Sequence, residues 1–375
     1  MPKPLVTNAE LGAAIAATFP EAGEIVAAGG GAPVYLVGGA VRDLLLGRER
    51  GDLDLVTEGD PAEIAARLGS ETTHHRRFST AKARLGSHQV DIARARTETY
   101  PHPGALPEVS PAEGIAEDLA RRDFTINAMA IPLSPADGAE LIDPHGGRDD
   151  LEAGVLRVLH SGSFADDPTR ALRAARYAAR FGFELEPGTA ELLASADLAT
   201  VSEDRRRAEL GRIAAEATAP RAFELLGEWG LAVLRPGGAE LAAVVSDLLA
   251  SPPWSGFVEP APAVLAAALG PPGEEADLAA AEPARPSLAV LAAAGRDPVE
   301  LALARAMGAE WLDDYAGDWR HVRLEIGGDD LIAAGVPSGP AIGRGLGEAL
   351  RRKLDGEVHG REQELAAALE AAAAD

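Results

Sequence analysis

The chain has 375 residues, 46% of them hydrophobic, and a formal net charge of −24. This length and apolar content favour more than one domain. Cysteine is absent, which excludes disulfide bonds, thiolate metal sites and cysteine nucleophiles, and which fits a reducing cytoplasm.

The charge and the apolar runs restrict the partners. A net charge of −24 repels phosphate unless basic residues are locally concentrated, so the chain is not expected to coat nucleic acid non-specifically. No apolar run approaches the roughly 20 residues of a membrane span, and the N-terminus lacks a basic region followed by a long apolar stretch. We therefore expect a soluble, cytoplasmic protein with no membrane partner.

The organisation of the chain changes near residue 150. Before it, short apolar runs broken by turns predict strands among helices, and after it Ala/Leu/Glu/Arg stretches predict helices only. Pro and Gly predict loops at 251–262 and 270–286. The expected fold class is α+β, with a small mixed sheet in an N-terminal head followed by an all-helical remainder. The predicted strands are 34–37, 53–56, 89–93 and 126–131.

The stretch 34–47 is predicted to form a strand, a glycine turn at Gly38 and Gly39, a helix over 40–46, and a C-cap at Gly47. Glycines at such a turn allow a phosphate to approach backbone N–H groups, and Arg42 adds a forked positive charge. For a lone diglycine, a plain tight turn is the more common explanation.

Two aspartates follow this helix. Asp52 and Asp54 alternate with leucines on the next predicted strand, so both carboxylates point to one face. Crowded carboxylates repel each other unless a divalent cation lies between them, and Mg²⁺ with substrate phosphates is the natural occupant. A solvated strand edge is the alternative. Asp91, on another predicted strand, is a candidate third member of the cluster.

Five stretches of the chain carry recognisable motifs: 35–56, AEDLARRDFTINAMAI at 116–131, 141–187, VSEDRRRAEL at 201–210 and 328–346. Taken together and in this order, they resemble the bacterial-type tRNA nucleotidyltransferases, or CCA-adding enzymes, which share a branch with bacterial poly(A) polymerases. The resemblance implies a nucleotidyltransferase head (1–150), a helical neck that selects the nucleotide (151–215), a helical body (216–310) and a helical tail that binds tRNA (311–375).

The resemblance also implies roles for single residues. Asp52 and Asp54 would hold Mg²⁺ as catalytic residues, and Asp91 would complete their cluster. Asp167 and Arg170 would bind the base edge of CTP or ATP. The other residues that the resemblance places at the nucleotide are Gly38, Gly39, Arg42, Arg122, Asp123, Arg173 and Arg176.

The chemistry of the bases supports the pair Asp167 and Arg170 independently. A carboxylate accepts from an exocyclic amine, which C and A carry, and a guanidinium donates to ring acceptors. The arginines from 170 to 180 share one face of a predicted helix, with alanines and leucine opposite. The alternatives are an N-cap for Asp167 ahead of Pro168 and a solvated helix face for the arginines.

The implied activity is template-independent addition of C, A or both to the 3′ end of tRNA from CTP and ATP, with release of pyrophosphate. Complete CCA addition, CC addition and A addition share these motifs. The alternatives are a bacterial poly(A) polymerase and a non-catalytic RNA-binding relative. A basic loop at 74–77 is a candidate aid to the switch from C to A. The departures from the family pattern are Ser79, Asp166, Asp204 and Arg206.

Overall fold

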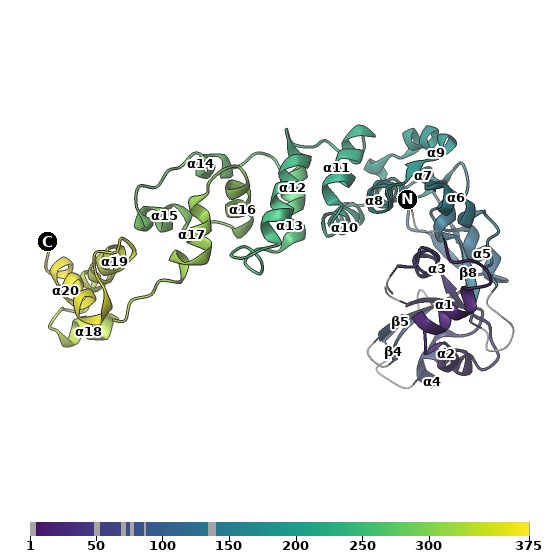
Figure 1. The fold of residues 1–375 in the computed structure, drawn as a ribbon, viewed down its shortest axis with the longest axis horizontal. Helices are drawn as coiled ribbons and strands as arrows, with labels where there is room; N and C mark the ends of the chain where they lie inside the picture. The colour runs from purple at the N-terminus through teal and green to yellow at the C-terminus, as the bar shows by residue number, and fades with distance from the viewer. Residues whose placement is uncertain are drawn as a thin grey trace. The chain divides into compact units, whose positions relative to one another are not determined.

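The computed structural model describes residues 5–48, 53–68, 73–75, 79–85, 88–133 and 140–374. The chain divides into two compact units, Met1–Glu209 and Leu210–Asp375. The first contains every strand of the described chain, and the second is helical (Figure 1). This arrangement confirms the predicted α+β class, and the finer division into head, neck, body and tail stays a prediction.

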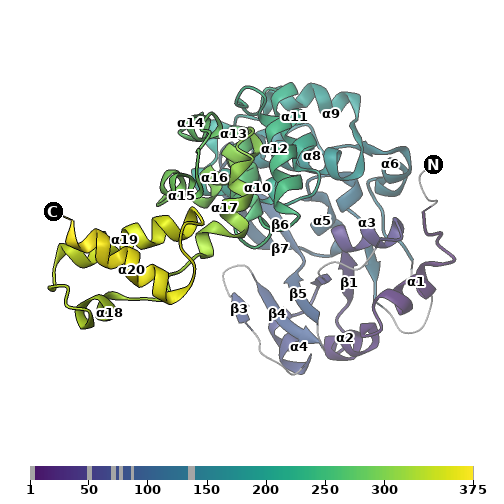
Figure 2. The same ribbon diagram turned by 60° about the vertical axis from the view of Figure 1, so that its left-hand side comes forward.

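The first unit is built on a six-stranded mixed sheet in the order β3-β4-β5-β2-β1-β8. Strands β2 and β5 are parallel, and the other neighbours are antiparallel. Figure 2 shows the sheet with α2 and α4 side by side at one end of it. The strands are β1 (Val34–Val37), β2 (Leu53–Thr57), β3 (Thr73–His75), β4 (Thr80–Leu85), β5 (His88–Arg94) and β8 (Ala130–Pro132).

The remaining elements of this unit surround the sheet. Two small sheets pair β6 (Arg96–Thr99) with β7 (Glu108–Pro111) and β9 (Val155–Leu156) with β10 (Glu184–Leu185). Helix α10 continues past the boundary of the unit. The helices are α1 (Leu11–Thr18), α2 (Ala22–Gly29), α3 (Gly39–Leu45), α4 (Pro61–Leu68), α5 (Ile115–Ala120), α6 (Gly147–Ala153), α7 (Ser163–Asp166), α8 (Thr169–Phe181), α9 (Pro187–Leu192) and α10 (Glu203–Ala214).

One face of the sheet is covered by α5. Tyr35, Val37 and Val56 alternate toward this face and pack with Ile115 and Leu119 of the helix. All four residues of β1 are buried, as expected for a strand that is covered on both faces. These apolar contacts between α5 and the sheet therefore fix where the segment after α5 meets the strands.

The predicted strands at 34–37, 53–56 and 89–93 are confirmed, as is the helix after the glycine turn, and Gly47 has the left-handed φ of +60° that a helix end favours. The prediction of a strand over 126–131 is wrong in its first half. Residues Thr125–Asn127 form a 3₁₀ turn, and β8 begins only at Ala130. The turn places the Asn127 side chain among buried polar groups, which an extended strand would not do.

Besides the end of α10 and a 3₁₀ turn at Trp319–His321, the described residues 210–374 of the second unit form ten α-helices and no strand. The predicted loop at 251–262 ends earlier because α13 begins at Pro260, and α14 lies inside the predicted loop 270–286. Leu331, Ala349 and Ala368 belong to a core near the C-terminus. The helices are α11 (Ala219–Glu228), α12 (Gly238–Leu249), α13 (Pro260–Leu269), α14 (Glu275–Ala279), α15 (Pro286–Ala293), α16 (Pro298–Ala306), α17 (Trp311–Gly317), α18 (Gly328–Ala333), α19 (Pro340–Leu354) and α20 (Gly360–Ala373).

Within the described residues, no single helix combines the length and the apolar character needed to cross a membrane. In the same described ranges, one pair of consecutive helices, α1 and α2, meets that test together, but the two are bent by 94° relative to each other.

The start of α6 provides a test of the packing in the first unit. A Cβ at Gly147 would overlap the carbonyl oxygen of Thr125, which belongs to the 3₁₀ turn. We expect Gly147→Ala to destabilise the chain by about 1–3 kcal/mol, the usual cost of overpacking a buried site. The measurement is urea unfolding followed by circular dichroism.

Gly23→Ala is the matched control for this variant. Gly23 lies in the first turn of α2, and a Cβ there meets nothing within 4 Å. Alanine has the higher helix propensity, so this variant should gain about 0.5–1 kcal/mol. Equal effects of the two substitutions would show that the close contact at Gly147 does not limit stability.

Candidate active site

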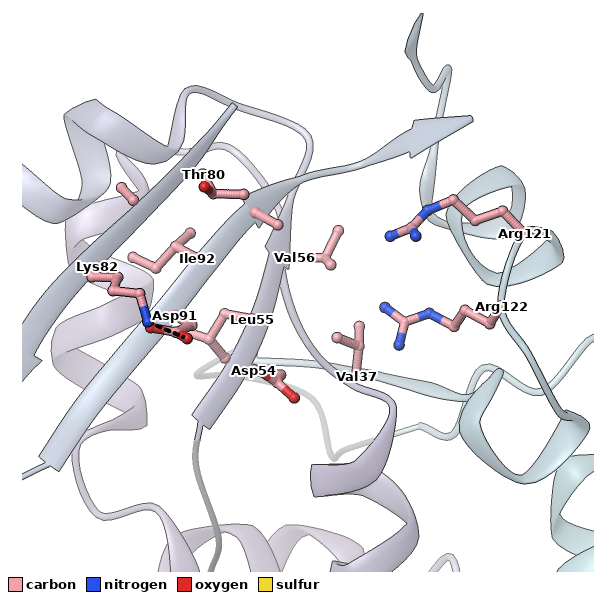
Figure 3. Close-up of a pocket in the computed structure, with 12 residues that line it drawn as sticks. Val37, Asp54, Leu55, Val56, Thr80, Lys82, Asp91, Ile92, Arg121 and Arg122 are labelled. Carbon is pink, nitrogen blue, oxygen red and sulfur yellow. Dashed lines mark hydrogen bonds and ion pairs between the residues drawn. The ribbon is translucent and has the colours of Figure 1, made fainter. Parts of the chain in front are cut away.

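A cavity of about 250 Å³ opens on the face of the sheet beyond the end of α5 (Figure 3). We call it the sheet cavity. Strands β2, β4 and β5 provide one wall, and the segment after α5 provides two arginines that reach toward the strands. Its polar lining residues are Asp54, Thr80, Lys82, Asp91, Arg121 and Arg122.

The structure brings two of the three predicted carboxylates together. Asp54 and Asp91 are register partners on the parallel strands β2 and β5, so they stand next to each other on one face. Lys82 lies on β4, which pairs with β5, and its Nζ donates to Asp91 Oδ2 at 3.0 Å. Asp52 lies outside the described residues. Among the residues that are described, no three His, Cys, Asp or Glu side chains form a group able to hold a metal ion.

The glycine turn lies beside the cavity arginines. Gly38 has a φ of +65°, and a Cβ on it would come within 2.5 Å of Arg122 Nη1. Only glycine combines this backbone with such a close approach. Gly39 is the first residue of α3, where backbone N–H groups have no partner within the helix.

Arg42 is buried inside the first unit, with only 3% of its surface exposed. Its Nη1 donates to Asn127 Oδ1 at 2.6 Å, and its Nε donates to Asp43 Oδ1 at 2.9 Å. The guanidinium carbon lies 4.6 Å from the ring centre of Phe181 in α8. Arg42 therefore ties the glycine turn to α8 and places a positive charge near that turn.

Arg122 borders the sheet cavity and is fixed by two neighbours. Its Nη2 donates to Asp118 Oδ2 at 3.0 Å, and its Nη1 donates to the carbonyl oxygen of Asn127 at 3.4 Å. Asp118, fully buried in α5, and Asn127 were not among the residues predicted from the sequence. Asp118 stands three positions before Arg121 and four before Arg122, and residues at these spacings contact each other on a helix. This spacing is the sequence signal that could have identified Asp118.

Asp123 joins the loop after α5 to α8. Its Oδ2 accepts from Arg173 Nε at 2.8 Å, and its Oδ1 accepts from Asn127 Nδ2 at 3.0 Å and from the backbone N–H of Phe124 at 2.9 Å. Burial alone would raise the pKa of this carboxyl, but Arg173 and these hydrogen bonds outweigh it and lower the pKa to about 2. Asp123 is therefore a buried anion at neutral pH.

A second cavity, of about 370 Å³, lies next to Arg170, and we call it the Tyr100 cavity. Arg170 is 5% exposed, and it donates to Ser163 Oγ at 2.7 Å and to the carbonyl oxygen of Arg121 at 2.8 Å. Burial, together with the negative charge of Glu98, raises the pKa of Tyr100 to about 12, so its phenol stays protonated. The polar lining residues are Thr97, Glu98, Tyr100, Glu117, Arg121, His160, Asp166 and Arg170.

Asp167 caps the start of α8, as the N-cap interpretation predicted. Its Oδ1 accepts from the backbone N–H and the hydroxyl of Thr169, at 3.0 and 2.6 Å, and from Arg205 Nη2 at 2.9 Å. Cap geometry and ligand binding are compatible, since all three bonds use one oxygen. Arg205 comes from α10, so Asp167 also connects two helices of the unit.

The interpretation of the arginines on α8 as a solvated face is wrong for Arg170 and Arg176 and holds for Arg180 at the end of the helix. Arg170 is buried and the Arg176 side chain is 11% exposed, whereas the Arg180 side chain is 38% exposed. The Arg173 side chain is 31% exposed and bound to Asp123. Arg176 Nη2 lies 4.0 Å from Glu209 Oε2. The helical pattern identified the shared face correctly, but its first part, from Arg170 to Arg176, packs against acidic and polar partners in the rest of the unit.

The departures from the family pattern fall at several places. Ser79 has a φ of +46°, and it is the only non-glycine with positive φ in the described parts of the chain. This left-handed backbone explains why a glycine suits the position. Asp166 lines the Tyr100 cavity, 4.0 Å from His160 Nδ1. Arg76 and Arg77 of the predicted basic loop lie outside the described residues, whereas β3 includes the backbone of His74 and His75.

Comparisons with known proteins agree with this geometry. Residues 34–157 match the poly A polymerase head domain family. The A-adding tRNA nucleotidyltransferase of Halalkalibacterium halodurans is 45% identical over 205 residues, which are 52% of this chain and 48% of that protein. The chain thus spans about half the length of that relative.

Two further similarities extend over nearly the whole chain. The CC-adding tRNA nucleotidyltransferase of Deinococcus radiodurans is 35% identical over 354 residues, which are 90% of this chain and 89% of that protein. The solved structure of a CCA-adding enzyme, apo form II, is 29% identical, with a TM-score of 0.80 over 96% of this chain and 98% of that one.

The buried anion Asp123 gives a pH dependence that can be measured. Its folded pKa of about 2 lies below the ordinary value of 3.8, so its stabilisation is complete above about pH 5 and is lost as the pH falls toward 2. The shift corresponds to about 2 kcal/mol. We expect the difference in unfolding free energy between the wild type and Asp123→Asn to shrink by about this amount between pH 6 and pH 2. A difference that stays constant in urea unfolding over this range would contradict the assignment.

Proposed function

The chain belongs to the tRNA nucleotidyltransferase family, and on that premise we propose that it adds C residues to the 3′ end of tRNA from CTP without a nucleic-acid template. The observation that carries this proposal is the alignment with the CC-adding enzyme over nine-tenths of both chains. Complete CCA addition is the second candidate, supported by the TM-score of 0.80 to a CCA-adding enzyme. CTP is a substrate in both cases, and ATP only in the second.

In the proposed reaction, the 3′ hydroxyl of the tRNA attacks the α-phosphate of CTP. A new bond forms between that oxygen and phosphorus, the bond from phosphorus to the oxygen that bridges to the β-phosphate breaks, pyrophosphate leaves, and the hydroxyl proton passes to solvent. Arg122 would neutralise triphosphate charge from one side of the sheet cavity, and backbone N–H groups at Gly38 and Gly39 would add donors. Catalysis then consists mainly of positioning and charge stabilisation.

Nucleotidyltransferases of this family generally use a divalent metal ion. The donor set fits Mg²⁺, because Asp54 and Asp91 offer carboxylate oxygens on one face, and Asp52 precedes Asp54 by two residues in the sequence. We propose Asp52 and Asp54 as the ligands, with Asp91 beside them. A bound Mg²⁺ would lower the pKa of the attacking hydroxyl and offset negative charge on the phosphates.

We also propose that Asp167 and Arg170 read the base. Arg170 borders the Tyr100 cavity, and Asp167 Oδ2 makes no hydrogen bond among the described residues, so it is available to accept from the exocyclic amine of C or A. Arg173 and Arg176, one and two turns later on α8, are the proposed phosphate contacts together with Asp123, which holds Arg173. Arg42 would act at the triphosphate from the glycine turn.

The remaining predicted features belong to the same proposal. The neck (151–215) would select the nucleotide, while the body (216–310) and tail (311–375) would hold tRNA. A cytoplasmic location follows from a tRNA substrate. A poly(A) polymerase would instead extend long A tails, and a non-catalytic RNA-binding relative would incorporate nothing. Asp54, present in the sheet cavity, argues against the non-catalytic alternative.

Asp54→Ala tests the metal assignment. We expect it to reduce nucleotide incorporation by at least about 1000-fold, since the ligand of a catalytic metal is lost, while tRNA affinity stays within about threefold. Asp149→Ala removes an exposed carboxylate from α6, outside both cavities, and should leave incorporation unchanged. Retained turnover in Asp54→Ala would refute the metal role.

Three tRNA transcripts distinguish the candidate activities. They end at the discriminator base, after C or after CC, and each is incubated with CTP, ATP or both before its 3′ end is sequenced. We expect the first two to be extended to CC. Further extension of all three to CCA would identify complete addition, and growth that starts only from CC would refute C addition. Long A tails would identify a poly(A) polymerase.

A further inference from the structure

The carboxylate of Asp118 holds the two arginines that border the sheet cavity. Its Oδ1 accepts from Arg121 Nη2 at 2.8 Å and Nε at 3.0 Å, and its Oδ2 accepts from Arg122 Nη2 at 3.0 Å and Nε at 3.3 Å. We propose that Asp118 is a positioning residue for nucleotide binding, one that fixes both guanidinium groups before the substrate arrives. This inference rests on the proposed function.

The surroundings of Asp118 give this carboxylate a single geometry. Its side chain is fully buried, and its helix α5 is anchored by Ile115 and Leu119 in the core under the sheet. The backbone N–H of Arg96 adds a third donor, at 3.3 Å from Oδ1. Burial alone would raise the pKa of Asp118, but the charges of Arg122 and Arg121 outweigh it and lower the pKa. The group is therefore an anion whose two oxygens are both used.

Arg121 extends the network to the second cavity. It borders both the sheet cavity and the Tyr100 cavity. Its Nη1 donates to Glu98 Oε1 at 2.9 Å, and Glu98 Oε2 accepts from the Tyr100 hydroxyl at 3.1 Å. Arg170 in turn donates to the Arg121 carbonyl oxygen and lies 5.9 Å from the centre of the Tyr100 ring. A continuous set of contacts thus joins Asp118 to the proposed base reader.

Holding the arginines in advance has an energetic consequence. An unrestrained arginine loses side-chain entropy when it orders around a ligand, so a prepositioned one binds phosphate more tightly. Arg122 reaches the cavity opposite Asp54 and Asp91, as Figure 3 shows. In the part of the chain that the structure describes, Asp118 is the carboxylate that holds it there. Asparagine at this position has one acceptor oxygen, so it can satisfy only one of the two arginines.

The experiment is a double-mutant cycle on CTP affinity, measured by calorimetry with the full chain and Mg²⁺. We expect Asp118→Asn to weaken CTP binding at least about tenfold, which is the effect of losing one charged hydrogen bond. In an Arg122→Ala background, the same substitution should have an effect at least about fivefold smaller, because its main partner is gone. An equal loss in both backgrounds would overturn the proposal.

Asp150→Asn is the matched control. Asp150 is also a buried carboxylate of this unit that binds an arginine, with its Oδ2 at 3.0 Å from Arg157 Nε, and it borders neither cavity. The CTP affinity of the Asp150→Asn variant should stay within about twofold of the wild type, even if its thermal unfolding temperature falls as far as that of Asp118→Asn. A similar loss of affinity in both variants would mean that any broken buried ion pair suffices, and would overturn the specific role of Asp118.

The two proposals fail in different ways. A wild-type chain that binds CTP but extends no tRNA would refute the proposed function, while the binding cycle would still decide the role of Asp118. A wild-type chain that binds neither CTP nor ATP would refute both.

Discussion

The pairing of buried carboxylates with arginines is the constraint on which the site depends. Asp118 and Asp123 lie on either side of the pair Arg121 and Arg122, and each is almost completely buried. A buried anion without a partner is strongly unfavourable, so each of these carboxylates requires its cations in place. The cationic partners of Asp118 are Arg121 and Arg122, which follow it directly in the chain. The cationic partner of Asp123 is Arg173 of α8. The same pairing that makes these anions tolerable also sets the positions of the cavity arginines.

This arrangement reconciles an acidic chain with a polyanionic substrate. The net charge of −24 belongs to the whole sequence, whereas three arginines of the first unit, Arg121, Arg122 and Arg170, line the two cavities. Local charge at the site matters more than the total charge of the chain. Salt largely screens the interactions between exposed charges that lie more than about 8–10 Å apart. Arginine suits the task, since its planar fork binds one carboxylate and still presents N–H groups to a phosphate. The use of arginine in place of lysine therefore has a structural basis here, besides any bias in composition.

The sequence predicted best those features that depend on neighbouring residues. The strand, glycine turn and helix over 34–47 follow from local backbone preferences, and Asp54 follows from simple alternation. The burial of Arg170 was missed because a helical pattern shows which residues share a face but not what covers that face. The 3₁₀ turn at Thr125–Asn127 was missed for a similar reason. The short apolar run around it is typical of a strand, and the hydrogen bonds of Asn127 with Asp123 and Arg42, which accompany the turn, join residues that the sequence pattern does not connect. Lys82 was overlooked because its partner Asp91 is set by strand register.

The contact between Asp167 and Arg205 does not depend on the residues that flank Arg205 in the sequence. Arg205 Nη2 binds Asp167, and its Nη1 donates to the carbonyl oxygen of Gly104 at 2.9 Å, so one side chain joins α10, the start of α8 and a loop. The two departures in this stretch, Asp204 and Arg206, are the residues on either side of Arg205. On a helix, adjacent positions point about 100° apart, so changes at 204 and 206 leave the direction of Arg205 intact. The orientation of Asp167 toward its proposed ligand thus depends on Arg205, and the substitutions beside it do not by themselves remove that support.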